Sequence, residues 1–186
     1  MLDRTHKKRR EAGFCLRMMT AESSKTWTRT EPEAIDFHIS AFVSAARAVT
    51  WVLHKERPDE YAAWAPGWFE RLRREEPDLA DLADFFIDKR NKGQKEGGGD
   101  LELIITEVPL PQFLREAWAE GMHIEVHTGP PGNPQPTFPR HEHRFAGRRD
   151  VPIPDLCARY LDLMTRFVRE FEAAHPPGDA PKATGA

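Results

Sequence analysis

The amino-acid sequence predicts a mainly α-helical protein, a helical bundle of four to five main helices with a small antiparallel β insertion before the last helix. Two observations lead to this prediction. Apolar residues recur at helical spacing along most of the chain, whereas alternating segments are confined to residues 101–147. The last helical segment, 153–173, carries a wide apolar stripe that has to be buried, so we expect it to return to the bundle.

Two helices are expected in the first third of the chain. The first spans 9–24, and the second runs from an N-cap at Thr30 to about Lys55. The second helix is apolar around much of its circumference, which is typical of a central position in a bundle. Small side chains at many other positions would let another helix approach closely. The apolar stripe consists of Ile35, Ile39, Phe42, Val43, Ala46, Val49 and Leu53, and the small residues are Ser40, Ala41, Ser44, Ala45 and Ala48.

Prolines mark the start of two further helices. Pro58 begins a helix that extends to about residue 74, and we expect Pro66-Gly67 to kink or split it. Pro77 begins a helix that runs to Arg90 or slightly beyond, because the three glycines at 97–99 prevent its continuation. Four helices are therefore predicted ahead of the insertion.

The insertion is expected to contain the strands. Residues 101–108 alternate and are rich in Ile, and 122–127 alternate strictly, so both segments are predicted as strands. A short helix is expected between them. The segment 128–140 has five prolines and two glycines, which is typical of a loop. We expect 141–147 to return as the antiparallel partner of 122–127.

These elements give one helical domain with two flanking segments. We expect a basic helix or arm at 1–29, a bundle at 30–175 with the β and proline-rich insertion at about 101–150, and a disordered tail at 176–186. The first 30 residues carry eight Lys and Arg against three Asp and Glu. This basic segment is therefore expected to be a solvated helix face, a disordered arm or a tail that attracts phosphate.

The composition is typical of a cytoplasmic protein. The net charge of −3 argues against electrostatic nucleic-acid binding by the chain as a whole. No membrane association is expected, since no apolar run approaches the roughly 20 residues that cross a bilayer, and Arg17 interrupts the first apolar segment, unlike in a signal sequence. Cys15 and Cys157 lie in apolar-periodic segments and are expected to be buried free thiols.

Two pairs of histidines give a candidate metal site. His123 and His127 share one face of a predicted strand with Glu125, and His141 and His143 share one face of the next segment. If the two segments pair, four imidazoles and a carboxylate gather on one surface, and these groups are good zinc ligands. The alternative, which we favour, is the solvated face of a half-exposed sheet, and no cofactor is expected.

The strongest candidate for a functional site is Arg90-Asn91, expected in the last turn of its helix beside the glycine break. The arginine guanidinium is a planar fork suited to phosphate or carboxylate, and the asparagine amide can orient a neighbouring group. The alternative is an ordinary helix end, because a cation is favourable there and Asn commonly ends helices. The glycine-rich "EGGGD" that follows lacks the context and the ending of a P-loop.

Together with the preceding long helix, "DFFIDKRNKGQKEGG" (84–98) resembles the HEPN superfamily of helical-bundle proteins, including uncharacterised bacterial members. The resemblance covers about residues 30–100 and, more weakly, 153–173. The hallmark of that family is R-N-x-x-x-H at a helix end. The resemblance implies metal-independent RNA cleavage at a dimer interface in catalytic members, with Arg and His acting on the phosphate and Asn orienting them.

Residue by residue, Arg90 and Asn91 match the motif, Lys95 stands in place of its histidine, and Glu96 matches the residue that follows. Lysine ordinarily has a pKa near 10.4, so it is protonated at neutral pH and is a poor proton shuttle. We therefore expect a non-catalytic or impaired HEPN-like homodimer that binds RNA, a nucleotide or a protein partner. One alternative is a ribonuclease toxin in which Lys95 or His54 replaces the histidine, and another is a metal-binding protein that uses the His-rich insertion.

Overall fold

The computed structural model describes residues 2–23, 32–96, 101–109, 127–128 and 136–176. Within these ranges the protein is mainly helical, with five helices and a small antiparallel sheet before the last helix, which confirms the predicted fold class. The helices are α1 (Asp3–Ser23), α2 (Pro32–Glu56), α3 (Pro58–Glu75), α4 (Pro77–Glu96) and α6 (Ile153–Ala174), and the strands are β1 (Leu101–Pro109), β2 (His127–Thr128) and β3 (Pro136–Phe145).

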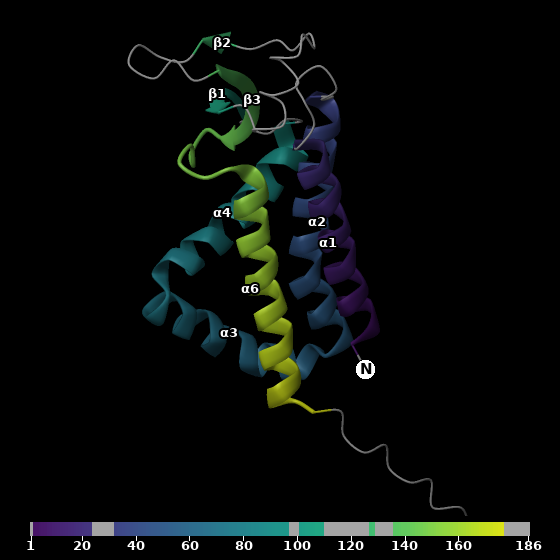
Figure 1. The fold of residues 1–186 in the computed structure, drawn as a ribbon. Coiled ribbons are helices and arrows are strands. Elements are labelled where there is room, and N and C mark those ends of the chain that lie inside the picture. Colours follow the sequence, from purple (N-terminus) through teal and green to yellow (C-terminus); the bar gives the residue numbers. More distant parts are fainter. Residues whose placement is uncertain (1, 24–31, 97–100, 110–126, 129–135, 177–186) are drawn as a thin grey trace, which may run out of the picture.

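The helices form a bundle with the sheet at one end (Figure 1). α1 and α2 pack along each other as an antiparallel pair, and α6 runs beside them, while α3 and α4 complete the opposite side. No helix in the described ranges has the length and hydropathy that crossing a bilayer requires. The described strands lie beyond one end of the bundle, and the helices pack against one another along their lengths (Figure 1).

The apolar stripe of α6 supplies the centre of the core. The Tyr160 ring stacks on Phe86 of α4 with 4.4 Å between ring centroids, and Phe167 lies 4.8 Å from Trp68 of α3. The expected return of this helix to the bundle is confirmed, because its whole apolar face is buried there. The buried residues of α6 are Ile153, Leu156, Cys157, Tyr160, Leu163, Met164, Phe167, Val168 and Phe171.

The sheet is joined to the bundle through Phe145, the last residue of β3. Its side chain is 1% exposed, and its ring lies 5.2 Å from Phe85 and 6.3 Å from Phe86 of α4. An aromatic side chain of this size, fully buried, contributes a large part of the apolar area at such a contact. β3 is therefore held in place by α4 at its C-terminal end.

β3 is the central strand of the sheet, with β1 on one edge and β2 on the other. It pairs antiparallel with β1 over its whole length, from Leu101 opposite Phe145 to Pro109 opposite Thr137, and its start pairs with β2. The predicted pairing of 141–147 with 122–127 concerns residues 122–126, which lie outside the described ranges. Phe145 lies opposite Leu101 and packs against α4, so the beginning of β1 lies near this helix. Residues 110–126, including the expected short helix, lie outside the described ranges.

Two features of the helices differ from the prediction. α1 begins at Asp3 rather than at residue 9, because Leu2 and Thr5 are already buried in the bundle. α3 is not split, since its helical assignment is continuous through Pro66. The carbonyl of Ala62, which loses its donor to the proline, belongs to an exposed residue, so water can satisfy it.

The N-terminus of α1 is capped by a side chain from another helix. A carboxylate oxygen of Glu56, the last residue of α2, accepts a hydrogen bond of 2.9 Å from the amide of Arg4, and the other accepts bonds from the Thr5 amide (3.1 Å) and hydroxyl (2.6 Å). An acceptor satisfies amides that lack an intrahelical partner, and its negative charge suits the helix dipole. This contact fixes the open end of the α1–α2 pair.

The two cysteines are free and buried, as expected. Burial raises the pKa of both thiols, and it raises that of Cys157 well above the usual value. A thiol with a raised pKa is a poor nucleophile at neutral pH. Both cysteines therefore belong to the core.

We expect Glu56→Gln to destabilise the fold by about 1 kcal/mol at neutral pH, the usual size of a lost helix cap. Burial opposes ionisation of Glu56, but the hydrogen bonds from Thr5 and Arg4 outweigh it and lower the pKa of the carboxyl. A carboxyl with a lowered pKa stabilises the fold above its unfolded pKa, and this stabilisation is lost as pH falls through the folded value. Urea unfolding at pH 7 and near pH 3 should therefore show the difference between wild type and variant shrinking in acid.

The matched control is Glu70→Gln, at an exposed position on α3. This variant should unfold like the wild type at both pH values. A Glu56→Gln variant as stable as wild type at pH 7 would show that the cap contributes nothing to folding.

Candidate functional site

Arg90 lines a cavity between α4 and α2. The cavity has a volume of about 250 Å³, and its other lining residues, Ser44, Arg47, Ala48 and Trp51, all come from α2. The Arg90 side chain is half-buried, as is that of Arg47. The structure therefore brings the predicted arginine together with a second arginine from a helix more than forty residues earlier.

The spacing of residues on α2 creates the hollow. Ser44, Ala48 and Trp51 follow one another at intervals of four and three residues, so they lie on one side of the helix. This side is opposite the buried stripe of α2. Serine and alanine are too small to fill the space beside α4, whereas Arg47 and Trp51 on either side are large. The cavity is thus a consequence of small residues between long ones.

Arg47 is held in place by its own helix and lies close to two tyrosines. Its guanidinium donates a 2.6 Å hydrogen bond to the hydroxyl of Thr50, a buried residue one turn along. Burial raises the pKa of Tyr160 to about 12, and the nearby charge of Arg47 opposes that rise. Burial likewise raises the pKa of Tyr61, opposed by Arg47 and by a hydrogen bond with Thr50. Both phenols are therefore neutral at pH 7 and leave the Arg47 charge uncompensated.

The two arginines give the cavity positive charge and hydrogen-bond donors. Neither guanidinium forms an ion pair with a carboxylate of the described residues, and Arg47 uses only the hydroxyl of Thr50. A guanidinium presents donors in a fixed fork that matches the oxygens of carboxylate and phosphate. Two such groups beside a serine hydroxyl favour a multiply charged anion over a carboxylate.

Trp51 forms the rim of the cavity and remains largely open to solvent. Its side chain is 60% exposed although it lines the hollow, and the ammonium of Lys55 lies 5.4 Å from its ring centroid. An exposed tryptophan in a soluble protein marks a surface that contacts another molecule more often than a scattered small apolar residue does. The rim therefore adds an aromatic surface to the site.

The other predicted site residues lie apart from the cavity or outside the description. Asn91 is exposed and does not line the cavity, and the side chains of Lys95 and Glu96 are outside the described residues. The expectation that Arg90 and Asn91 occupy the last turn was wrong, because α4 continues to Glu96. Most residues between Asn91 and the three glycines at 97–99 are good helix formers, so the helix continues as far as Glu96.

His54, considered as a substitute for the missing histidine, points elsewhere. Its ring lies 5.1 Å from that of Tyr61 on α3, and it is not among the residues that line the cavity. It follows Arg47 by two helical turns, a rise of roughly 10 Å along α2. His54 is therefore outside direct reach of an anion held between Arg47 and Arg90.

Sequence reasoning missed Arg47 and Trp51. One signal for Arg47 was present, since it is the only Lys, Arg, Asp or Glu between residues 37 and 54 in an otherwise apolar helix. A charged side chain in such a stretch either lies on the solvated face of the helix or has a partner that compensates its charge. Its pairing in space with Arg90 depends on how α2 and α4 pack, which periodicity alone does not specify.

The strand register separates His127 from His141 and His143. His127 pairs with Thr137, whereas His141 and His143 pair with Ile105 and Leu103. Four residues of strand, roughly 14 Å, therefore separate the position of His127 from that of His141. His123 lies outside the described ranges. Among the described residues, no three metal-binding side chains gather in a group that could hold an ion.

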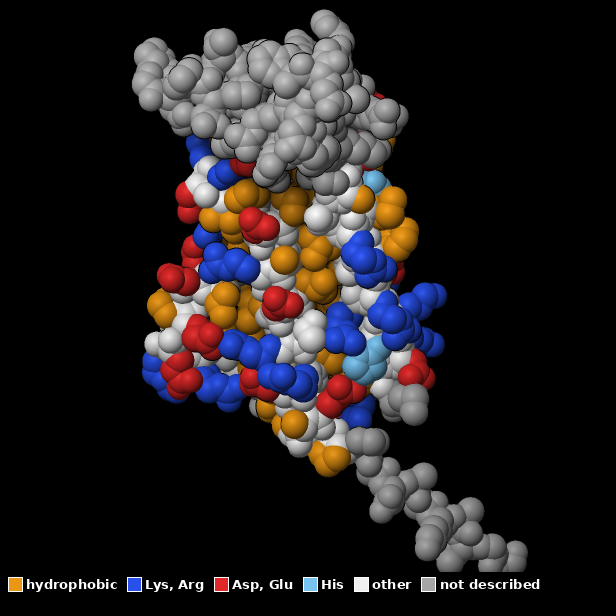
Figure 2. Space-filling view, in the orientation of Figure 1, with side chains coloured by type: hydrophobic (Ala, Val, Ile, Leu, Met, Phe, Trp, Pro, Cys, Tyr) orange, Lys and Arg blue, Asp and Glu red, His pale blue; other side chains and the backbone are white. Residues whose placement is uncertain are grey.

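The predicted basic segment forms the solvated face of α1 rather than a separate arm. Lys7 and Arg10 are exposed on the helix, and Lys8 forms a 2.8 Å ion pair with Glu11. Figure 2 shows Lys and Arg side chains gathered over the part of α1 that lies away from the sheet. This basic surface lies on a helix that does not line the cavity.

A second hollow, of about 460 Å³, is acidic. It lies between α4 and the chain after β3, and Arg148, which pairs with Asp81, is the only Lys or Arg among its described lining residues. Its carboxylates would repel a phosphate, so this hollow does not compete for the same ligand. Its lining residues are Asp81, Asp84, Phe85, Asp88, Gly147, Arg148 and Asp150.

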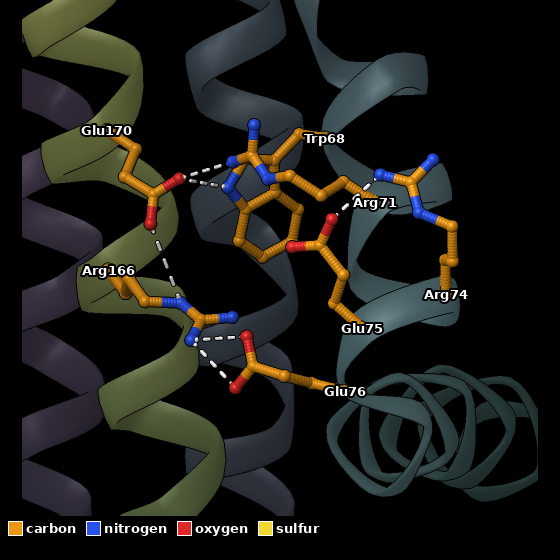
Figure 3. Close-up of polar contacts among 7 residues, drawn as sticks. All are labelled: Trp68, Arg71, Arg74, Glu75, Glu76, Arg166 and Glu170. Atoms are coloured by element: carbon orange, nitrogen blue, oxygen red, sulfur yellow. Dashed lines mark hydrogen bonds and ion pairs between the residues drawn. The ribbon is translucent and has the colours of Figure 1, made fainter.

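A third hollow, of about 200 Å³, is lined by side chains whose ion pairs connect α3 and the residue after it to α6 (Figure 3). Glu170 of α6 accepts hydrogen bonds from the Trp68 indole N–H (2.8 Å) and from Arg71 (2.6 Å) of α3. Arg166 of α6 reaches across to Glu76, with a shortest N–O distance of 2.8 Å. Since these charged side chains pair with one another, we interpret them as a contact that holds the helices together rather than as a site for a ligand.

Comparison with protein-family models, with curated proteins and with solved structures found no match to this chain. The resemblance to the HEPN superfamily therefore remains a prediction from short motifs. The function of this protein is therefore inferred from the chemistry of the cavity alone.

We expect Glu170→Ala to destabilise the protein by roughly 1–3 kcal/mol, because it removes the acceptor of a buried indole N–H together with two guanidinium contacts. Urea unfolding measures this change. The matched control is Glu75→Ala, whose partner Arg74 is 73% exposed, so it should lie within about 0.5 kcal/mol of wild type. Equal stability of the two variants would show that the Glu170 contacts do not hold α3 to α6.

Proposed function

We propose that this protein binds the phosphate group of a nucleotide unit, free or within single-stranded RNA, in the cavity between α2 and α4, and does not cleave it. The observation that carries the proposal is the convergence of Arg47 and Arg90 on one cavity without carboxylate partners among the described residues. The proposal agrees with the binding role expected for a HEPN-like protein that lacks the motif histidine.

The dimensions of the cavity favour part of a larger ligand over a whole small molecule. Pockets that enclose small molecules usually measure about 300–1,000 Å³, and this cavity measures about 250 Å³. A phosphate with its sugar fits within it, and the attached base would remain at the rim. Trp51 stands at that rim with its ring available for stacking, which contributes about 1–3 kcal/mol per base in single-strand binding.

The side chains around the cavity support binding without cleavage. The lining residues are serine, alanine, tryptophan and two arginines, and none of these titrates near neutral pH. Hydrolysis or transesterification of RNA requires a group that accepts and donates a proton in that range. In the described part of the chain, the cavity therefore offers charge stabilisation but no proton shuttle.

We expect Arg90→Ala and Arg47→Ala each to weaken nucleotide binding by roughly tenfold or more, because a hydrogen bond to a charged group contributes about 1.5–3 kcal/mol. Titration calorimetry with inorganic phosphate, a nucleoside monophosphate and a short single-stranded oligoribonucleotide measures the loss. The three ligands separate phosphate recognition from recognition of base and chain. Binding should also weaken as salt concentration rises.

The matched control is Arg169→Ala, an exposed arginine of α6 away from the cavity, which should bind as wild type does. Trp51→Phe should remove any ligand-dependent change in tryptophan fluorescence while retaining a stacking surface. If no phosphate-bearing ligand binds the wild-type protein, the proposal fails.

We expect the purified protein to leave single-stranded RNA intact, with and without added chelator, on a gel of end-labelled substrate. The reason is that none of the described side chains lining the cavity is of a type that exchanges a proton near neutral pH. RNA cleavage that persists in chelator and disappears in Arg90→Ala would contradict a binding role and would favour the ribonuclease alternative.

A further inference from the structure

The described lining of the cavity suits one phosphate group and one base rather than a run of nucleotides. Arg47 and Arg90 are the cations among the described lining residues, and Trp51 is the aromatic residue among them. Proteins that hold a single strand along its length use a basic groove with aromatic rings for successive bases. One ring beside two cations therefore matches a single nucleotide, with its phosphate inside the cavity and its base at the rim.

The hydrogen-bond donors of the lining come from both α2 and α4. The side chains of Arg90 and Ser44 form no hydrogen bond or ion pair with another residue in the described part of the chain. Arg47 uses one guanidinium nitrogen, Nη1, on the hydroxyl of Thr50 (2.6 Å), which leaves its other N–H groups for a ligand. Two guanidinium groups and a serine hydroxyl can therefore donate to the same anion.

Phosphate groups differ in how many of these donors they can use. A phosphate at the end of a nucleotide is a monoester, which has three terminal oxygens and carries close to two negative charges at neutral pH. A phosphate inside an RNA strand is a diester, with two such oxygens and a single charge. Two arginines and a hydroxyl therefore match the monoester both in charge and in the number of acceptors.

The size of the cavity favours the same ligand. A diester continues into a sugar on each side of the phosphorus, whereas a monoester carries one sugar. The cavity measures about 250 Å³, less than the roughly 300 Å³ at which pockets for whole small molecules begin. It therefore has room for a phosphate with one attached sugar more readily than for a phosphate between two.

We propose that the cavity selects the terminal phosphate monoester of a nucleotide, free or at the end of a strand, over the internal phosphodiesters of RNA. Arg47 and Arg90 balance the two charges of this phosphate, and Ser44 donates to its third oxygen. This inference rests on the proposed function and narrows its ligand to one class of phosphate. The internal phosphates of a bound strand remain outside the cavity.

Two probes with the same base and sugar test the selectivity. We expect adenosine 5′-monophosphate to bind roughly tenfold or more tightly than its methyl diester at pH 7.5, because the diester loses one acceptor of a charge-assisted hydrogen bond. Titration calorimetry at constant ionic strength measures both affinities. Equal affinity of the two probes would overturn the selectivity and leave phosphate binding intact. No binding of either probe would instead count against the proposed function itself.

The pH dependence of binding gives a second test. The second proton of a phosphate monoester has a pKa of about 6, whereas the arginines of the lining stay protonated. The monoester should therefore bind with constant affinity above pH 7 and lose roughly fivefold or more in affinity between pH 7.5 and pH 5. The diester has no group that titrates in this range, so it reports any effect of the histidines of the protein. A parallel change for both probes would contradict the proposal.

Two strands and two variants complete the experiment. A short oligoadenylate with a 5′-phosphate should bind roughly tenfold or more tightly than the same strand with a 5′-hydroxyl, for the same reason as the monoester. Arg90→Gln and Arg47→Gln should each shrink the advantage of the monoester over the diester, with helical circular dichroism unchanged. The matched control is Arg169→Gln, at an exposed position of α6, which should keep the full advantage. Equal binding of the two strands, or an undiminished advantage in both cavity variants, would refute selection of a terminal phosphate by these arginines.

Discussion

The ring of Phe86 on α4 is the contact on which the rest of the structure depends. It stacks on Tyr160 of α6 at 4.4 Å and meets Phe42 of α2 edge-on at 6.0 Å, and it also lies near Phe145 at the end of β3. Three helices and the sheet therefore share one buried side chain. Arg90 follows Phe86 by one helical turn on α4, so the packing that buries Phe86 also directs Arg90 toward α2 and Arg47.

The sequence allowed the helical elements to be predicted because their apolar spacing is sustained. The stripe of α6 and that of α2 each require burial, and the structure buries both. The ends were less predictable, since Leu2 and Thr5 extend α1 through contacts with distant residues. The partner of β3 was less predictable for the same reason: the alternation of 141–145 is compatible with several partners, and the pairing with β1 depends on contacts between distant residues.

Only one of the two arginines of the candidate site could be predicted from the sequence. Arg90 was singled out by the motif around it, whereas Arg47 is a single cation in an apolar helix whose role appears only when α4 packs beside it. In the structure Arg90 lies inside a helix and lines a cavity, whose described lining residues include two arginines and no side chain of a type that titrates near neutral pH. This lining supports the proposed binding of a phosphate without cleavage.

A double-mutant cycle on Arg47 and Arg90 tests the central claim most directly. If both guanidinium groups hold the same phosphate, the two alanine substitutions should be coupled, and the loss of binding energy in the double variant should differ from the sum of the single losses by about 0.5–3 kcal/mol. Calorimetric titration of a nucleoside monophosphate into the four proteins measures this difference. Strictly additive losses, or no loss in either single variant, would contradict a shared anion site between α2 and α4.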